Sequence, residues 1–256
     1  LDRQPTEGLL ERIDTSWYKD SETEFTLTKV SEVLGIAKLS NEGKTFEGKT
    51  IKLGSDIVLN TVDEETLAAW KDGTGVARNL WTPIGSETTP FAGTFDGQGH
   101  TISGLYLNTN AEGAGLFGRT TKPSEFRNFK LVDSYMKSTG DNLGLIGEGT
   151  FTTIEKVYTD VTIVSEGSRV SGFIGLVKGL DDKVMTISNC WFDGTITQTV
   201  GGEGSVGGFV GVTNGGANNV AKFENCINKG TVTIDKVNSL TSVTCLGGFI
   251  GYARFM

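Results

Sequence analysis

One short pattern recurs along the chain: a glycine, two apolar residues and a second glycine. It occurs five times, and the copies begin at Gly115, Gly144, Gly172, Gly208 and Gly248. Self-similarity at such a period predicts a repeat architecture, in which each repeat stacks on the next. We expect the glycines to be tight points of each repeat and the apolar pairs to fill the core. The second glycines of the five copies are Gly118, Gly147, Gly175, Gly211 and Gly251.

A second pattern places two large apolar residues three positions apart. We align the segments 102–105, 126–129, 154–157, 187–190 and 223–226. Because alternate side chains of a strand point to opposite faces, both apolar residues can be buried only if the strand bends between them. The third positions are Gly104, Asn128, Lys156, Asn189 and Asn225. Gly and Asn enter the left-handed region at the lowest cost, so we predict a left-handed bend there, with Lys156 strained.

Short strands that turn at Gly or Asn once per repeat predict an all-β fold, a parallel β-helix. Successive repeats would lie about 4.8 Å apart, so that like residues stack and Asn189 and Asn225 form an amide ladder. Each repeat carries about five large apolar side chains, worth roughly 1.5–3 kcal/mol each on burial, which one repeat cannot bury alone. The lack of long amphipathic helices after residue 71 argues against a doubly wound α/β fold.

The N-terminal part departs from the repeats. Residues 1–23 are polar and irregular, and we interpret them as a lead-in or linker. An apolar stripe predicts a helix at about 29–41, which would cap the apolar end of the first repeat. Residues 24–256 are expected to form a single domain, interrupted by an excursion at about 60–90 that holds a short helix from Asp63 to Lys71.

Composition and charge argue against several kinds of binding partner and cofactor. The formal net charge is −8 and no basic stripe occurs, which argues against nucleic acid as a partner. The three cysteines lack CxxC spacing and His100 is the single histidine, so we expect no metal site and no cofactor. No apolar run approaches the length of about 18 residues that a spanning helix needs, and we expect no direct membrane insertion. Since Leu1 is not Met, we interpret the chain as part of a longer one with further domains.

The segments 91–105 and 115–118 resemble repeats of bacterial surface proteins that carry the GLUG motif, and the resemblance extends over roughly residues 25–256. The stretch 27–59 is similar to the leader that often precedes the first repeat. The resemblance implies a right-handed β-helical array in an exported or cell-surface protein. Some members are large peptidases with a separate catalytic domain. No HExxH signature occurs in this chain, and the family supplies no catalytic residues to transfer.

Few side chains suggest chemistry. Asp96 and His100 could form a carboxylate–imidazole pair, but a Gly-rich turn in which Asp96 bonds its own backbone is the favoured interpretation. Cys190 and Cys226 occupy equivalent positions of two repeats. Aligned stacking would point both side chains the same way, so we expect free thiols rather than a disulfide.

Aromatic and acidic residues could make a ligand site. Trp81, Trp191 and Tyr106 could form a sugar-stacking platform. The acids of the array lack the density of a calcium loop, and we expect them in solvated turns; they are Asp133, Asp160, Asp181, Asp182, Asp193 and Glu203.

The repeats lengthen towards the C-terminus. The stretch from the bend pattern to the next repeated glycine runs from Ile102 to Gly115 in the first case, and the last, from Phe223 to Gly248, is almost twice as long. Insertions in solenoids gather on one face and often bind ligands. We therefore predict that the loops 197–205, which contains Glu203, and 234–245 carry the specificity.

The leading hypothesis is a non-catalytic, adhesin-like or structural module of a bacterial cell-surface or secreted protein, which binds a host or environmental glycan or surface protein. The alternative is a carbohydrate-active enzyme, a polysaccharide lyase or glycoside hydrolase, on the same scaffold. That alternative needs outward carboxylates with a nearby base across two or three repeats, and the sequence does not reveal such a cluster. A third interpretation is a stalk within a longer surface protein.

Overall fold

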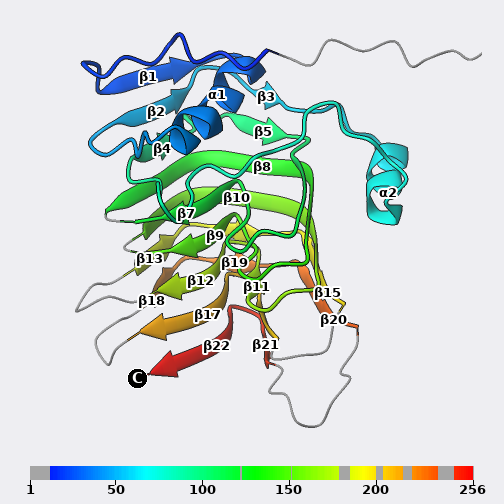
Figure 1. Cartoon of the computed structure of the whole chain (residues 1–256). Helices are drawn as coiled ribbons and strands as arrows, with labels where there is room; N and C mark the ends of the chain where they lie inside the picture. The colour runs from blue at the N-terminus through cyan, green and yellow to red at the C-terminus, as the bar shows by residue number, and fades with distance from the viewer. Residues whose placement is uncertain are drawn as a thin grey trace, which may run out of the picture.

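The computed structural model describes residues 12–121, 123–150, 152–178, 185–199, 204–215, 221–235 and 245–255. Within these ranges the fold is mostly β, with parallel sheets and two helices (Figure 1). The strands stack from β1 at one end to β22 at the other, and α1 lies at the β1 end (Figure 1). The prediction of an all-β fold with parallel strand pairing is confirmed.

Three sheets run along the stack. The first has 14 strands: β1 (Glu24–Leu27), β2 (Thr50–Leu53), β3 (Ile57–Val58), β4 (Thr94–Asp96), β5 (Thr101–Ser103), β6 (Tyr106–Thr109), β8 (Ser124–Ser138), β10 (Thr152–Ser165), β13 (Met185–Ser188), β14 (Trp191–Phe192), β15 (Thr195–Gln198), β18 (Ala221–Glu224), β19 (Ile227–Asn228) and β20 (Thr231–Ile234). The second has five strands: β7 (Phe117–Thr120), β9 (Ile146–Gly149), β12 (Ile174–Lys178), β17 (Val210–Gly215) and β22 (Ile250–Phe255). The third has three: β11 (Val170–Ser171), β16 (Ser205–Gly207) and β21 (Cys245–Gly247).

Each repeat pairs in parallel with the next, so that inward residues form columns through the core. In one column Phe95 pairs with Phe126, Phe126 with Ile154, Ile154 with Ile187, and Ile187 with Phe223. The first four of these side chains are almost fully buried. Burial of one face sets this register, because a slip of one residue would turn the column to solvent.

The predicted left-handed bend is confirmed in the later repeats. The φ angles are 57° at Asn128, 53° at Lys156, 53° at Asn189 and 51° at Asn225. The amide ladder is confirmed too, since Asn225 Nδ2 donates to Asn189 Oδ1 at 3.3 Å. Lys156 adopts the same conformation, although it lacks the short polar side chain that lowers the energetic cost of this conformation for Asn.

The alignment of segment 102–105 with these bends is wrong. Ile102 pairs with Leu131, which already lies past the bend at Asn128. Gly104 (φ 71°) instead lies at a second left-handed bend, next to Asp133 (φ 48°). The equivalent of Asn128 is the turn after Phe95, where Gln98 has a φ of 53°. The first repeat makes this turn with a Gly-Gln-Gly sequence, so a sequence pattern that relies on Asn could not identify it.

Close packing rather than backbone conformation requires nine of the ten repeated glycines; the exception is Gly248, where an added Cβ would lie 3.9 Å from its nearest neighbour. Among the described residues none of the ten has a positive φ. A Cβ on Gly115 would lie 2.0 Å from the carbonyl oxygen of Gly144, and one on Gly147 would lie 2.3 Å from Ala114 N. The apolar pairs of the first four copies are at most 1% exposed. In the fifth, Phe249 is 38% exposed.

Two helices join the stack. Helix α1 (Val30–Asn41) occupies the predicted position and packs Val33 and Ile36 into the main core. Helix α2 (Glu64–Asp72) lies in the excursion at the side of the stack (Figure 1). Its first turn is capped by Asp63, whose carboxylate accepts a bond from Thr66 N at 2.7 Å. No helix in the described part of the chain is long and apolar enough to cross a membrane.

The prediction of free thiols is confirmed. Cys190 and Cys226 are both unpaired. Each thiol lies against the preceding repeat, with Cys190 Sγ 3.8 Å from Ile154 O and Cys226 Sγ 3.3 Å from Ile187 O. The two side chains therefore point the same way along the stack, and burial raises the pKa of Cys190 to about 12.

Candidate ligand-binding groove

A groove of about 750 Å³ crosses four repeats at the left-handed bend of the first sheet. The residues that line it are Gln98, Gly99, Asn128, Phe129, Lys130, Lys156, Val157, Tyr158, Asn189 and Trp191. Five of them are left-handed: Gln98 and Gly99 in one repeat, and Asn128, Lys156 and Asn189 in the next three. At about 4.8 Å per repeat this row spans about 14 Å. The bend therefore places one polar side chain per repeat along the groove.

A second row follows the bend. Tyr158 pairs with Lys130 on one side and with Trp191 on the other, so the three occupy equivalent positions of successive repeats. The rings of Tyr158 and Trp191 meet edge to face with centroids 5.9 Å apart. Lys229 Nζ lies 4.2 Å from the centroid of the Trp191 ring, in a cation–π contact. The Trp191 N–H is buried and has no acceptor among the described residues.

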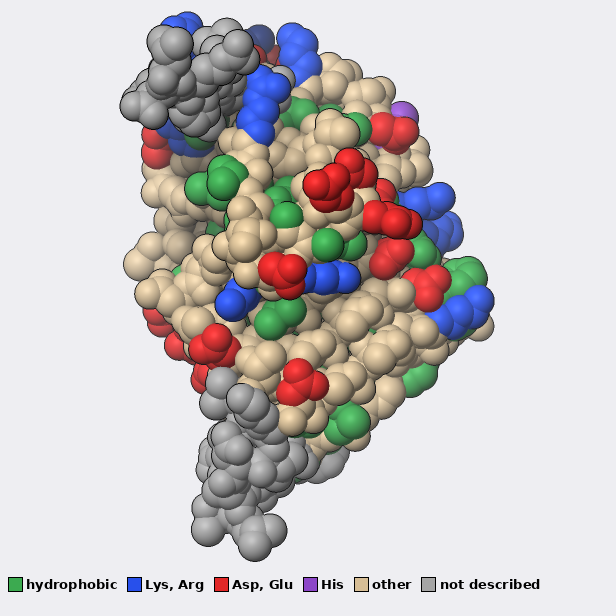
Figure 2. Space-filling model, turned by 90° about the vertical axis from the view of Figure 1, so that its right-hand side faces the viewer, with side chains coloured by type: hydrophobic (Ala, Val, Ile, Leu, Met, Phe, Trp, Pro, Cys, Tyr) green, Lys and Arg blue, Asp and Glu red, His purple; other side chains and the backbone are tan. Residues whose placement is uncertain are grey.

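The groove is basic on its own surface. No Asp or Glu is among its lining residues. Lys130 forms no ion pair with any described residue, whereas Lys156 Nζ lies 3.3 Å from Glu155 Oε1. The molecule as a whole is acidic, and on the side that carries α2 the Asp and Glu side chains are interspersed with Lys and Arg (Figure 2).

Three aspartates come together beside the groove, which the sequence interpretation missed. Asp160 and Asp193 follow paired residues of β10 and β14, and Asp133 lies in the preceding repeat. Partial burial, and then the charges of Asp193 and Asp133, raise the pKa of Asp160. Tyr158 Oη lies 3.4 Å from Asp193 Oδ2, and burial and these carboxylates raise the pKa of the phenol. All three residues are exposed, as expected for solvated turns, but the stacking of the repeats brings them into one row.

This acidic row does not resemble a metal centre. Within the described ranges, no group of three or more His, Cys, Asp or Glu side chains has a geometry that could hold a metal ion. Asp181 and Asp182 lie outside the described residues. The row could instead supply carboxylates for acid–base chemistry.

The expected aromatic platform is wrong for two of its three residues. Tyr106 is only 8% exposed and packs between Trp70 of α2 and Tyr135, with centroids 4.9 Å and 5.9 Å away. Trp81 is 5% exposed and packs into the main core, where its indole N–H donates to Leu116 O at 3.1 Å. Trp191 lies in the groove, with Tyr158 as its aromatic neighbour.

Glu203, in the loop 197–205 that was predicted to bind the ligand, lies outside the described residues. Most of the two loops that were expected to carry specificity is also outside them, namely 200–203 and 236–244.

The favoured interpretation of the Asp96 turn is confirmed. Asp96 Oδ1 accepts bonds from Gln98 N at 3.0 Å and from Asn128 Nδ2 at 3.1 Å, and Oδ2 accepts one from Arg127 Nε at 2.8 Å. Burial alone would raise the pKa of Asp96, but these bonds together lower it. His100 Nδ1 lies 3.2 Å from Asp56 Oδ1, so the pair of Asp96 with His100 does not form.

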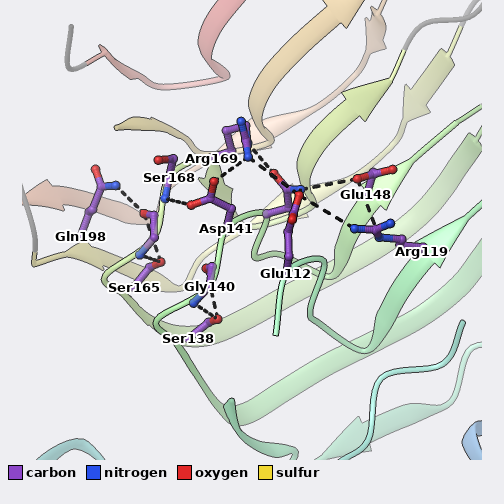
Figure 3. Close-up of polar contacts among 12 residues, drawn as sticks. Glu112, Arg119, Ser138, Gly140, Asp141, Glu148, Ser165, Ser168, Arg169 and Gln198 are labelled. Carbon is purple, nitrogen blue, oxygen red and sulfur yellow. Dashed lines mark hydrogen bonds and ion pairs between the residues drawn. The ribbon is translucent and has the colours of Figure 1, made fainter. Parts of the chain in front are cut away.

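A second polar cluster lies at a third bend of the repeats (Figure 3). Arg169 NH2 lies 2.6 Å from Asp141 Oδ2 and 4.0 Å from Glu112 Oε1. Arg119 reaches Glu112 and Glu148, each at 3.8 Å. Each cation is satisfied by carboxylates of neighbouring repeats, and loss of one partner would leave a poorly solvated charge. We interpret this cluster as a brace between repeats.

Comparisons with known proteins identify a sequence relative and a structural relative. No family model matches the chain. Halomucin of Haloquadratum walsbyi is 28% identical over 145 residues, which make up 54% of this chain and 2% of halomucin. The chain thus spans only a small part of the length of that relative.

The structure is similar to a crystal structure described as a "putative immunoglobulin A1 protease from Bacteroides ovatus". The TM-score is 0.54 and the identity 15%, over 92% of this chain and 85% of that one. At this identity the likeness shows a shared fold alone.

Proposed function

We propose that the chain is a right-handed parallel β-helical module of the GLUG-repeat kind, in a bacterial secreted or cell-surface protein, and that it binds a glycan chain without catalysing a reaction on it. The parallel register between successive repeats supports the solenoid. The similarity to part of halomucin supports a place in a long surface protein with further domains. The role would be adhesive or structural.

One observation carries the proposal: the groove aligns aromatic, amide and lysine side chains across four repeats. Sugars offer apolar ring faces for aromatic stacking and hydroxyl groups for amides, and sites that bind them need both. The groove is elongated along the stack, which suits a chain better than a compact molecule.

A glycan array with the wild-type protein and three variants tests this proposal. We expect Trp191→Ala and Tyr158→Ala to weaken binding at least tenfold. Tyr252→Ala serves as the control, because Tyr252 is 41% exposed and lies outside the groove. Binding that is unchanged in both groove variants would refute the assignment of the groove.

A carbohydrate-active enzyme is the second candidate, and the acidic row favours it. Glycoside hydrolases pair a carboxyl of raised pKa with an ionised carboxylate. Burial, with the charges of Asp193 and Asp133, raises the pKa of Asp160. Release of reducing ends from a bound polysaccharide, abolished by Asp160→Asn, would establish this activity. Binding without any product would leave the non-catalytic function in place.

A further inference from the structure

We propose that the groove selects an anionic glycan, with carboxylate or sulfate groups, and that Lys156 determines this selectivity. The inference rests on the proposed function, because it names the class of glycan that the same groove would take.

The first argument is the backbone of Lys156. Its φ is 53°, and other repeats place Asn128, Asn189 and Asn225 in the same conformation. Asn adopts this region readily because its short side chain can bond locally, whereas a long unbranched side chain gains no such bond. An unfavourable conformation that persists next to a groove is a reason to look for function at that residue.

A comparison within the chain shows that structural bonding does not account for Lys156. Arg169 is also left-handed, with a φ of 62°. Its guanidinium bonds Asn142 Oδ1 at 2.5 Å and Asp141 Oδ2 at 2.6 Å, so it ties two repeats together. The ammonium of Lys156 pairs with its sequence neighbour Glu155, and its side chain is 61% exposed. An exposed pair of this kind contributes little to stability.

The second argument is the charge around Lys156. Lys130 occupies the neighbouring repeat, and its ammonium has no ion-pair or hydrogen-bond partner in the part of the chain that the structure describes. No carboxylate lines the groove, although Glu155 pairs with Lys156 at 3.3 Å and Asp56 interacts electrostatically with Lys130. An anionic ligand would compete with these exposed carboxylates for the two lysines, most effectively at low ionic strength.

The acidic row also predicts the orientation of a bound ligand. Along β10 the order is Lys156, Tyr158 and Asp160, which spans at most about 13 Å of extended chain. The anionic groups of a ligand would therefore lie over the lysines, its sugar rings over Tyr158 and Trp191, and its neutral edge towards Asp160. The arrangement disfavours the reverse orientation, in which like charges would meet.

The test compares anionic glycans with matched neutral forms by calorimetric titration. The probes are polygalacturonate, alginate, hyaluronan and polysialic acid with their methyl esters, and dextran sulfate with dextran. We expect at least one anionic probe to bind at least tenfold more tightly than its neutral form, and to weaken as salt is raised. The carboxylate and sulfate arms identify which anion is preferred.

Three variants assign the effect. Lys156→Asn and Lys130→Gln should each reduce affinity for the anionic form about tenfold and leave the neutral form unchanged. Lys137→Gln is the control, since it removes a charge from β8, the strand of Lys130, at a position outside the groove. Lys156→Asn should melt at or above the wild-type temperature, which separates a ligand role from a structural one.

The possible failures are distinct. Equal affinity for anionic and neutral forms, or an anion preference that Lys156→Asn leaves intact, overturns this inference. If the neutral forms still bind and require Trp191, the proposed function survives. If no probe of either kind binds, neither proposal holds.

Discussion

Lys156→Asn is predicted to stabilise the protein. The left-handed conformation costs an ordinary L-residue about 1–2 kcal/mol, and Asn is several-fold enriched there, which corresponds to a gain of about 0.5–1 kcal/mol. The introduced amide could also extend the ladder that Asn225 forms with Asn189 at 3.3 Å, worth about 0.5 kcal/mol at an exposed site. The lost pair with Glu155 is exposed and contributes about 0–0.5 kcal/mol.

The net gain is therefore about 0.5–1 kcal/mol, since the ladder and the lost ion pair offset each other. For a chain of this size it corresponds to a rise of about 1–4 °C in the midpoint of thermal unfolding. Circular dichroism melts and urea titrations would measure it.

The matched control is Lys130→Asn, the same substitution in the preceding repeat. Lys130 is not among the positive-φ residues, so Asn has no conformational advantage there and its low strand propensity should reduce stability. If Lys156→Asn lowers the melting temperature as much as Lys130→Asn does, the argument from backbone strain is wrong.

The packing and the charges lead to three further predictions. Gly115→Ala should cost about 3 kcal/mol or prevent folding, because its Cβ would lie 2.0 Å from a backbone oxygen, whereas Gly149→Ala, with its nearest contact at 3.3 Å, should be far milder in urea titrations. Asp160 has a raised pKa in the folded state, so stability is lost as the pH rises above the ordinary value of 3.8. Asp160→Asn should therefore be stabilising at pH 7 and neutral at pH 3, and a larger benefit at pH 3 would contradict the sign. Cys190, with a pKa of about 12, should resist alkylation at pH 8 in the native protein and react after denaturation, as peptide mapping would show.

The local features of the fold were predictable because their causes are local. Asn128, Asn189 and Asn225 mark bends by residue type alone, and their φ angles agree. The helix over Val30–Asn41 follows from a stripe of apolar residues within one segment.

The register of the first repeat was not predictable from the pattern. Segment 102–105 matches the bend pattern in its residue types, yet Ile102 pairs with Leu131. Which strand faces which depends on how the whole repeat buries its apolar side chains. An insertion such as the Gly-rich turn at 97–99 shifts the strand register between repeats, but it does not change the residue types of the bend pattern.

The candidate site depended on tertiary structure for the same reason. Lys130, Tyr158 and Trp191 belong to three different repeats and are far apart along the chain, and only the parallel register makes them neighbours. Tyr106 was expected at the surface, but the excursion places α2 over it and buries the ring beside Trp70.

The sequence by itself determined that the chain repeats, where the later repeats bend at Asn128, Lys156, Asn189 and Asn225, and which apolar residues of the repeated patterns point inward, because residue type and spacing decide these features over a few positions. The tertiary structure decided which outward side chains share a groove and which carboxylates share a row. These neighbours depend on how repeats of unequal length stack on one another. The resulting shift in register cannot be predicted from a local sequence pattern.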